Sequence, residues 1–148
     1  MAKAGLFVII AIGFVAIAGC GGTYDASAHG TVTLEGKPVP RGMVSFHPVS
    51  GGPAAYAMIS DDGQYVIRTG REEGLPAGDY QVSITANEAP TVSQTSNGGP
   101  PPPGKMITPA WYRMKETSGL KCTVARGKNT IDLDLKSQPP AGWTGQGK

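Results

Sequence analysis

The chain has 148 residues, and its 13 lysines and arginines nearly balance 11 aspartates and glutamates, which leaves a formal net charge of +2. This balance gives no reason to expect a nucleic acid as partner, because binding to phosphates requires an excess of clustered cations. The length fits one domain of ordinary size.

Residues 1–19 are predicted to be a signal peptide. A single cation, Lys3, precedes an uncharged run of apolar and small residues from 4 to 19. This run is shorter than the roughly 20 apolar residues that cross a bilayer, and no second apolar segment follows it. A transmembrane anchor is therefore the weaker interpretation.

Cys20 ends the stretch IAGC, which resembles the lipobox of bacterial lipoproteins. The resemblance implies that Cys20 carries acyl chains and becomes the first residue of the mature protein. Two or three chains would anchor it to a membrane, since each buried methylene contributes about 0.8 kcal/mol. Residues 20–28 would then be a lipidated tether, and the protein would lie in the cell envelope, on its periplasmic or extracellular face. The alternative is an ordinary secretory signal with an incidental cysteine.

If Cys20 carries lipid, Cys122 has no partner for a disulfide within the chain. The stability of the domain must then come from its core.

Residues 29–136 are predicted to form an all-β domain of seven antiparallel strands. Short stretches of alternating apolar and polar residues are separated by Gly, Pro, Asp and Asn, the pattern of a sandwich or barrel. A tight hairpin is expected at Asp62 and Gly63, because this pair tolerates positive backbone angles. In chain order, the residues expected to face inward are Val32, Leu34, Val44, Phe46, Tyr80, Val82, Ile84, Leu120, Cys122, Val124, Ile131, Leu133 and Leu135.

Four phrases of this domain resemble the carboxypeptidase regulatory-like domain. They are GTVTLEGKPVPRGMVSFHP (30–48), ISDDGQYVIRT (59–69), LPAGDYQVSI (75–84) and SGLKCTVARGKNTIDLDL (118–135). The resemblance is closest to small bacterial lipoproteins in which this domain is the whole exported part. It implies a single seven-stranded, transthyretin-like Greek-key β-sandwich. The shared residues shape turns and strand edges, so the resemblance implies a fold and not a function.

The sequence contains no recognisable catalytic constellation. It lacks the Gly-x-Ser-x-Gly elbow of common serine hydrolases and the Tyr-Arg-Gly-Ser end of the transthyretin-like enzymes. The only two histidines, His29 and His47, are too few for a zinc site and are expected on the surface. The acidic pair Asp61 and Asp62 lacks the regular ligand spacing of a calcium loop. We therefore expect a protein that is not an enzyme and that needs neither a metal nor another cofactor.

Residues 87–110 are predicted to be a long flexible loop, because they are polar and rich in Pro and Gly. The two aromatics that follow it are expected to pin the returning chain to the sandwich, the alternative being a sugar-stacking platform. Four consecutive prolines favour an extended conformation that a proline-recognising partner could bind. The candidate binding surface consists of Pro100, Pro101, Pro102, Pro103, Trp111 and Tyr112.

Cations outnumber acids from the end of this loop onward. A basic face near a membrane would attract anionic head groups, although a solvated face is the simpler interpretation. The cations are Lys105, Arg113, Lys115, Lys121, Arg126 and Lys128, and the single acid among them is Glu116. Residues 137–148 have no periodicity and are expected to fray.

These features predict a non-catalytic, lipid-anchored protein that acts as a binding or structural module. Its expected partners are the membrane, through the acyl chains on Cys20, and an envelope protein or glycan, but no nucleic acid. Two alternatives stay open: a carbohydrate- or peptide-binding accessory module, and a hydrolase with an unrecognised site.

Overall fold

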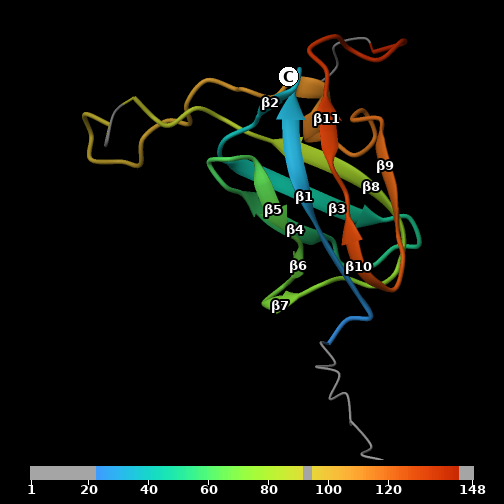
Figure 1. The fold of residues 1–148 in the computed structure, drawn as a ribbon. Coiled ribbons are helices and arrows are strands. Elements are labelled where there is room, and N and C mark those ends of the chain that lie inside the picture. Colours follow the sequence, from blue (N-terminus) through green and yellow to red (C-terminus); the bar gives the residue numbers. More distant parts are fainter. Residues whose placement is uncertain (1–22, 92–94, 144–148) are drawn as a thin grey trace, which may run out of the picture.

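The computed structural model describes residues 23–91 and 95–143. These residues form a sandwich-like all-β fold of two sheets that face each other (Figure 1). The smaller sheet contains β1 (Ala26–Leu34), β2 (Lys37–Pro38), β5 (Gln64–Val66), β10 (Gly127–Thr130) and β11 (Leu133–Leu135). The larger sheet has the order β7 (Glu72–Glu73), β6 (Arg68–Thr69), β4 (Ala55–Ile59), β3 (Gly42–Pro48), β8 (Gly78–Thr85) and β9 (Leu120–Val124). No helix within the described ranges is long and apolar enough to span a membrane.

The expected count of seven antiparallel strands is wrong for the described part of the chain, which has eleven strands and two parallel pairs. β1 pairs in parallel with β10 and β11, and in antiparallel fashion with β2 and β5. Residues 64–69 alternate without a break but are divided between partners, because β5 pairs with β1 in the smaller sheet and β6 pairs with β4 and β7 in the larger one. Residues 127–135 form two strands, β10 and β11, which both pair with β1. Alternation reports which face is buried, whereas the partner of a strand depends on tertiary contacts.

β1 begins at Ala26, three residues before the expected start of the domain. Ala26 pairs with Gly127, and Ala26 and Ala28 are both buried. The last three residues of the expected tether, 26–28, therefore belong to the smaller sheet. Alanine is depleted in strands, which is why this stretch does not look like one in the sequence.

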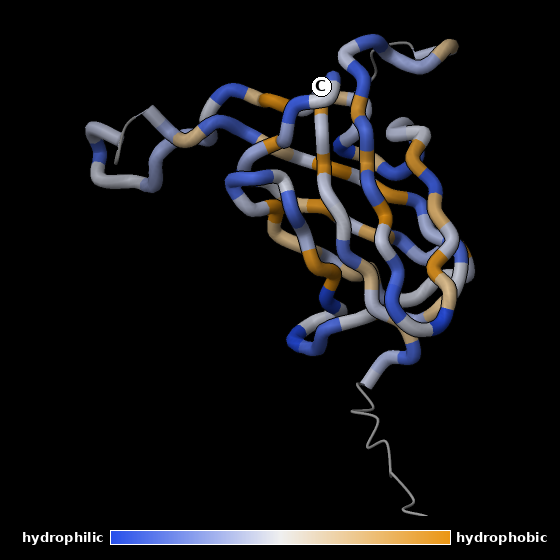
Figure 2. Tube along the Cα trace, viewed as in Figure 1, coloured by the Kyte–Doolittle hydropathy of each residue, from blue (hydrophilic) through white to orange (hydrophobic). Residues whose placement is uncertain are grey.

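The core consists of the inward-facing residues of both sheets. Figure 2 shows apolar segments spread along the strands, while the projecting loop is largely hydrophilic. All the residues expected to face inward lie in the core or pack against it. Phe46 is central: the centroid of its ring lies 6.1 Å from that of Tyr65 and 5.9 Å from that of Tyr80.

The segment that leaves the sandwich is shorter than the expected loop of residues 87–110. The Glu88 N–H donates to the Lys105 carbonyl at 2.7 Å, and the Ile107 N–H donates to the Ala86 carbonyl at 2.8 Å. The Ala86 N–H donates in turn to the hydroxyl of the buried Thr108, at 3.0 Å. The two ends of the loop are thus joined, and the described residues between 89 and 104 extend away from the sheets (Figure 1).

Part of the expected frayed tail also contacts the domain. Trp143 packs edge-on against Trp111, with the ring centroids 5.1 Å apart. The Ser137 N–H donates to Oε1 of Glu35 at 2.7 Å. Ser137 and Trp143, the two ends of the described stretch 137–143, therefore contact the domain, and the rest of the expected tail lies outside the described residues.

Candidate functional site

The structure does not bring the predicted site residues together. Cys20 lies outside the described residues. Trp111 and Tyr112 belong to the short helix η1 (Ala110–Arg113) and are 8% and 6% exposed. The Lys136 N–H donates to the Tyr112 hydroxyl at 2.9 Å. These rings pin the chain to the end of the sandwich, as expected in the first interpretation, and neither ring is free for stacking with a sugar.

The four prolines lie on the projecting segment. Three of them are exposed and Pro101 is half-buried. Because the aromatic rings are in the core, the six candidate residues do not form one surface.

The two histidines occupy different environments. His29 is exposed on β1, with its Nε2 3.2 Å from the Thr130 hydroxyl. His47 is half-buried on the outer face of the larger sheet, against the expectation of an exposed position, and its Nε2 is 3.0 Å from Oγ of Ser83. Burial, reinforced by the nearby Lys115, lowers the pKa of His47.

Sequence reasoning missed the pair of His47 and Ser83, because it forms diagonally between β3 and β8. Ser83 is only 7% exposed, so its hydroxyl is covered and serves as the partner of the imidazole. Within the described residues no group of three or more His, Cys, Asp or Glu side chains is placed to hold a metal ion.

A cleft opens where β4 and β5 separate. The two strands are joined by a turn in which the Ser60 N–H donates to the Gln64 carbonyl at 2.9 Å. Gly63 in this turn has a φ of +83°, and a Cβ there would lie 2.8 Å from the Val32 carbonyl oxygen. Glycine therefore allows the turn to pass close to β1.

The hairpin divides because β5 pairs with β1 and not with β4. Gly30 of β1 is opposite Tyr65, and the Tyr65 hydroxyl donates to the Ile131 carbonyl at 2.5 Å. The two arms meet again where Tyr56 pairs with Arg68. Between these two points, residues 57–59 do not pair with residues 65–67. The two strands, which belong to different sheets, therefore separate there.

Unpaired backbone groups face each other across this opening. The Ile67 N–H donates to the Ala28 carbonyl of β1 at 2.9 Å. Because successive residues of an antiparallel strand direct their N–H and C=O groups to opposite sides, those of Val66 point away from β1 and toward β4. By the same alternation from Ser60, those of Met58 point toward β5. Among the described strands, β4 pairs only with β3 and β6, so these two edges are unbonded.

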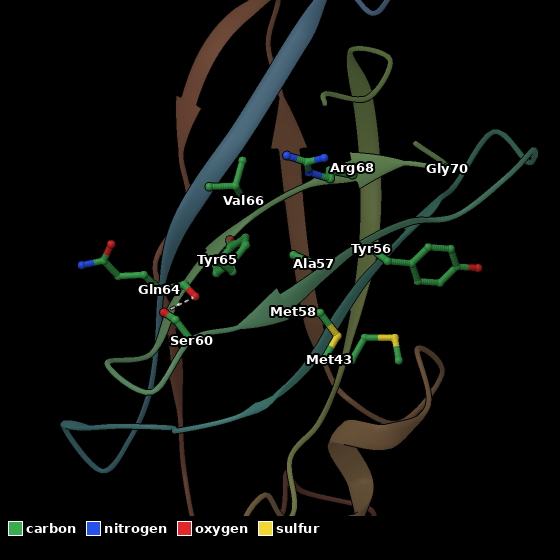
Figure 3. Close-up of a pocket in the computed structure, with 10 residues that line it drawn as sticks. All are labelled: Met43, Tyr56, Ala57, Met58, Ser60, Gln64, Tyr65, Val66, Arg68 and Gly70. Atoms are coloured by element: carbon green, nitrogen blue, oxygen red, sulfur yellow. Dashed lines mark hydrogen bonds between the residues drawn. The ribbon is translucent and has the colours of Figure 1, made fainter. Parts of the chain in front are cut away.

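The cleft has a volume of about 510 Å³ (Figure 3). Ala57 and Tyr65 are buried beneath it, and its apolar wall includes Met43, which is 43% exposed, and Met58, which is 73% exposed. Clefts of this volume and largely apolar lining are typical of small-ligand sites. The lining residues are Met43, Tyr56, Ala57, Met58, Ser60, Gln64, Tyr65, Val66, Arg68 and Gly70.

The sequence carried one signal of this cleft that its analysis missed. Met43 and Met58 occupy outward positions of their strands, where alternation normally places polar residues. The two strands pair with these methionines directly opposite each other.

Comparison with protein-family models, curated proteins and solved structures finds no match to this chain. The chain is a small all-β protein with two sheets.

Proposed function

We propose that this chain is a non-catalytic, lipid-anchored protein of the cell envelope that binds a ligand in the cleft between β4 and β5. The cleft is the observation that carries the binding role. It combines an apolar wall with unpaired backbone donors and acceptors, which is a recognition surface. The aromatic stacking platform expected of a sugar-binding module does not form, because Trp111 and Tyr112 are buried. This favours a peptide-binding module over a carbohydrate-binding one.

The anchor rests on the lipobox-like stretch IAGC, and it would hold the domain close to the membrane. Six Cα-to-Cα steps separate Cys20 from Ala26, where β1 begins, and an extended chain spans at most about 21 Å over that length. With acyl chains on Cys20, the end of the sandwich at Ala26 would be held close to the membrane.

The opposite end of the sandwich would then face away from the membrane. β1 runs from Ala26 to Leu34, nine residues that cover about 30 Å at the usual rise of a strand. The projecting segment follows the end of β8 that lies away from Ala26 (Figure 1). This arrangement would present the prolines to the envelope and not to the lipid.

The family proposal is the carboxypeptidase regulatory-like, transthyretin-like Greek-key sandwich. The two-sheet, sandwich-like architecture supports it. So does the turn at residues 35–36, where both backbone φ angles are positive, at 49° and 77°. Together with Leu34 and Lys37, which pair across it, this turn joins β1 to β2.

The replacement Cys20→Ser tests the anchor. The wild-type chain is expected to partition into detergent and to carry the mass of its acyl groups, whereas the variant is expected to stay unprocessed or to be released without lipid. Cys122→Ser is the matched control and should keep the lipid. A mature wild-type protein without added lipid mass would contradict the anchor.

The same cells test the cleft. A photo-crosslinking residue in place of Met58 should capture a defined envelope ligand, and one in place of the exposed Thr123 on β9 should not. Equal capture at both positions would contradict a binding role for the cleft.

A further inference from the structure

We infer that the cleft between β4 and β5 binds the C-terminal end of an apolar peptide, with the terminal carboxylate on Arg68. This inference rests on the proposed binding role of the cleft and adds the class of ligand.

The charge of the cleft favours one anionic group at one end. Among the described residues, Arg68 is the only charged one that lines it, and no carboxylate of theirs lines it. Arg68 takes part in none of the ion pairs within the described residues. A guanidinium matches the geometry of a carboxylate with two parallel hydrogen bonds. The residue opposite Arg68 in β7 is Glu73. Because opposite charges at facing positions attract, a ligand carboxylate would compete with the Glu73 carboxylate for the Arg68 guanidinium.

The unpaired strand edges favour a peptide over an acyl chain. The N–H and C=O groups of Met58 and Val66 face the opening, and hydrogen bonds to them require a ligand that has both donors and acceptors. A peptide main chain supplies both, as it does wherever an extended peptide binds to a sheet edge. A fatty acid of the same length would leave these groups without partners.

The walls favour apolar side chains of varied shape. Met43, Met58 and Val66 are 43%, 73% and 46% exposed. Figure 3 shows the two methionine side chains next to each other on the same side of the cleft. Methionine is unbranched and polarisable, so it adapts to ligands of different shape.

The closed ends favour a chain terminus over an internal segment. The hydrogen bond from Ser60 to Gln64 closes one end of the split, and the pair of Tyr56 and Arg68 closes the other. Between these closed ends only Met58 of β4 and Val66 of β5 direct backbone groups into the opening, because residues 57 and 59 bond toward β3 and residues 65 and 67 bond toward β1. The opening is therefore short, about the length of three residues in extended form. A longer chain would have to bend out of the sheet at both ends, whereas a terminus bends out at one.

The test is binding of fluorescein-labelled Gly-Gly-Val-Ile-Leu to the full chain in lipid nanodiscs, measured by fluorescence anisotropy. The free acid is expected to bind at least about tenfold more tightly than the C-terminal amide, the difference that one charged hydrogen-bonded pair contributes. Arg68→Gln should remove this preference, and Glu73→Gln should strengthen binding of the acid. Met58→Asp should abolish binding of both peptides. Arg113→Gln, at an exposed arginine on η1, is the matched control and should change nothing.

Two results would overturn the inference, and they bear differently on the proposed function. Equal binding of acid and amide, lost in Met58→Asp, would overturn recognition of the carboxylate while leaving the cleft as a binding site. Absence of binding by both peptides would overturn the peptide class. Two measurements test the proposed function and do not depend on Arg68. They are the capture of an envelope ligand at position 58 and the lipid mass on Cys20. A thermal melt of each variant distinguishes loss of contact from loss of fold.

Discussion

Tyr65 contacts both sheets. Its ring packs near Phe46 of the larger sheet, and its hydroxyl donates to the Ile131 carbonyl beside the smaller one. Burial raises the pKa of this hydroxyl above its ordinary value, so it stays protonated and keeps donating over the physiological pH range. This hydrogen bond adds to the pairing of β5 with β1, on the far side of the cleft from β4.

Cys122 is a second residue whose surroundings determine its chemistry. It is half-buried on β9 and packs against the core. Burial, reinforced by Asp79, raises the pKa of its thiol to about 11 from a reference value of 9.0. Only the thiolate reacts rapidly with alkylating reagents. The folded protein therefore contains roughly a hundredfold less reactive thiolate near pH 8 than an unfolded chain does.

We predict that iodoacetamide labels Cys122 slowly in the folded protein at pH 8. The rate should rise as the pH approaches 11, because the thiolate fraction then grows, and it should rise at once when the chain is unfolded in urea. Intact mass measured over time checks both. Rapid labelling under native conditions at pH 8 would show an exposed, reactive thiol instead.

At the scale of the element, β1 is the strand on which the smaller sheet depends. It pairs with β5 along one edge and with β10 and then β11 along the other. Between these two parallel partners the chain passes very close to β1. A Cβ on Gly30 would lie 1.9 Å from the Ile131 carbonyl oxygen, which is backbone and has little room to move.

We predict that Gly30→Ala lowers the free energy of unfolding by about 2–3 kcal/mol, because β1 and the chain at Ile131 must move apart. The matched control is Gly36→Ala, where a Cβ meets nothing within 4 Å but φ is +77°. That variant should lose only about 1 kcal/mol, the cost of a left-handed backbone. Urea denaturation checks both values. Equal losses would show that the close approach at Gly30 is relieved at no cost.

At the scale of the whole molecule, Ala26 at the start of β1 and the base of the projecting segment lie at opposite ends of the sandwich (Figure 1). A hydrogen bond between Glu88 and Lys105 joins the two ends of the projecting segment at its base. The residues beyond this bond can therefore be shortened without removing part of a strand. Closing a loop costs only about 0.6 kcal/mol for each doubling of its length. We therefore expect the stability of the sandwich to depend little on the residues beyond this base.

We predict that replacing residues 89–104 with a short Gly-Ser turn leaves the melting temperature unchanged or slightly raised. A partner that recognises the four prolines should be lost from the crosslinked envelope neighbours, whereas a ligand captured at Met58 should remain. The matched control is removal of residues 86–108, which also deletes the base and should destabilise the domain. Unfolding of the first variant would show that the projecting segment packs as part of the core.

The sequence by itself determined the all-β class, the inward face of each strand and the tight turn at Asp62 and Gly63. These follow from local physics, because side chains alternate along a strand and a glycine tolerates a positive φ. The pinning of the chain by Trp111 and Tyr112 was also within its reach, since large aromatics after a polar loop tend to be buried.

Only the tertiary structure decided which strands pair and where the cleft lies. β1 and β10 are about a hundred residues apart in the chain and pair in parallel, an arrangement that alternation does not encode. The opening between Met58 and Val66 exists because β5 pairs with β1, more than thirty residues earlier in the chain, and Tyr65 also bonds to Ile131, 66 residues away. The periodicity of the sequence indicates which face of a strand is buried, but contacts between distant residues determine which strands pair. In this chain those contacts separate β4 from β5 and so form the candidate site.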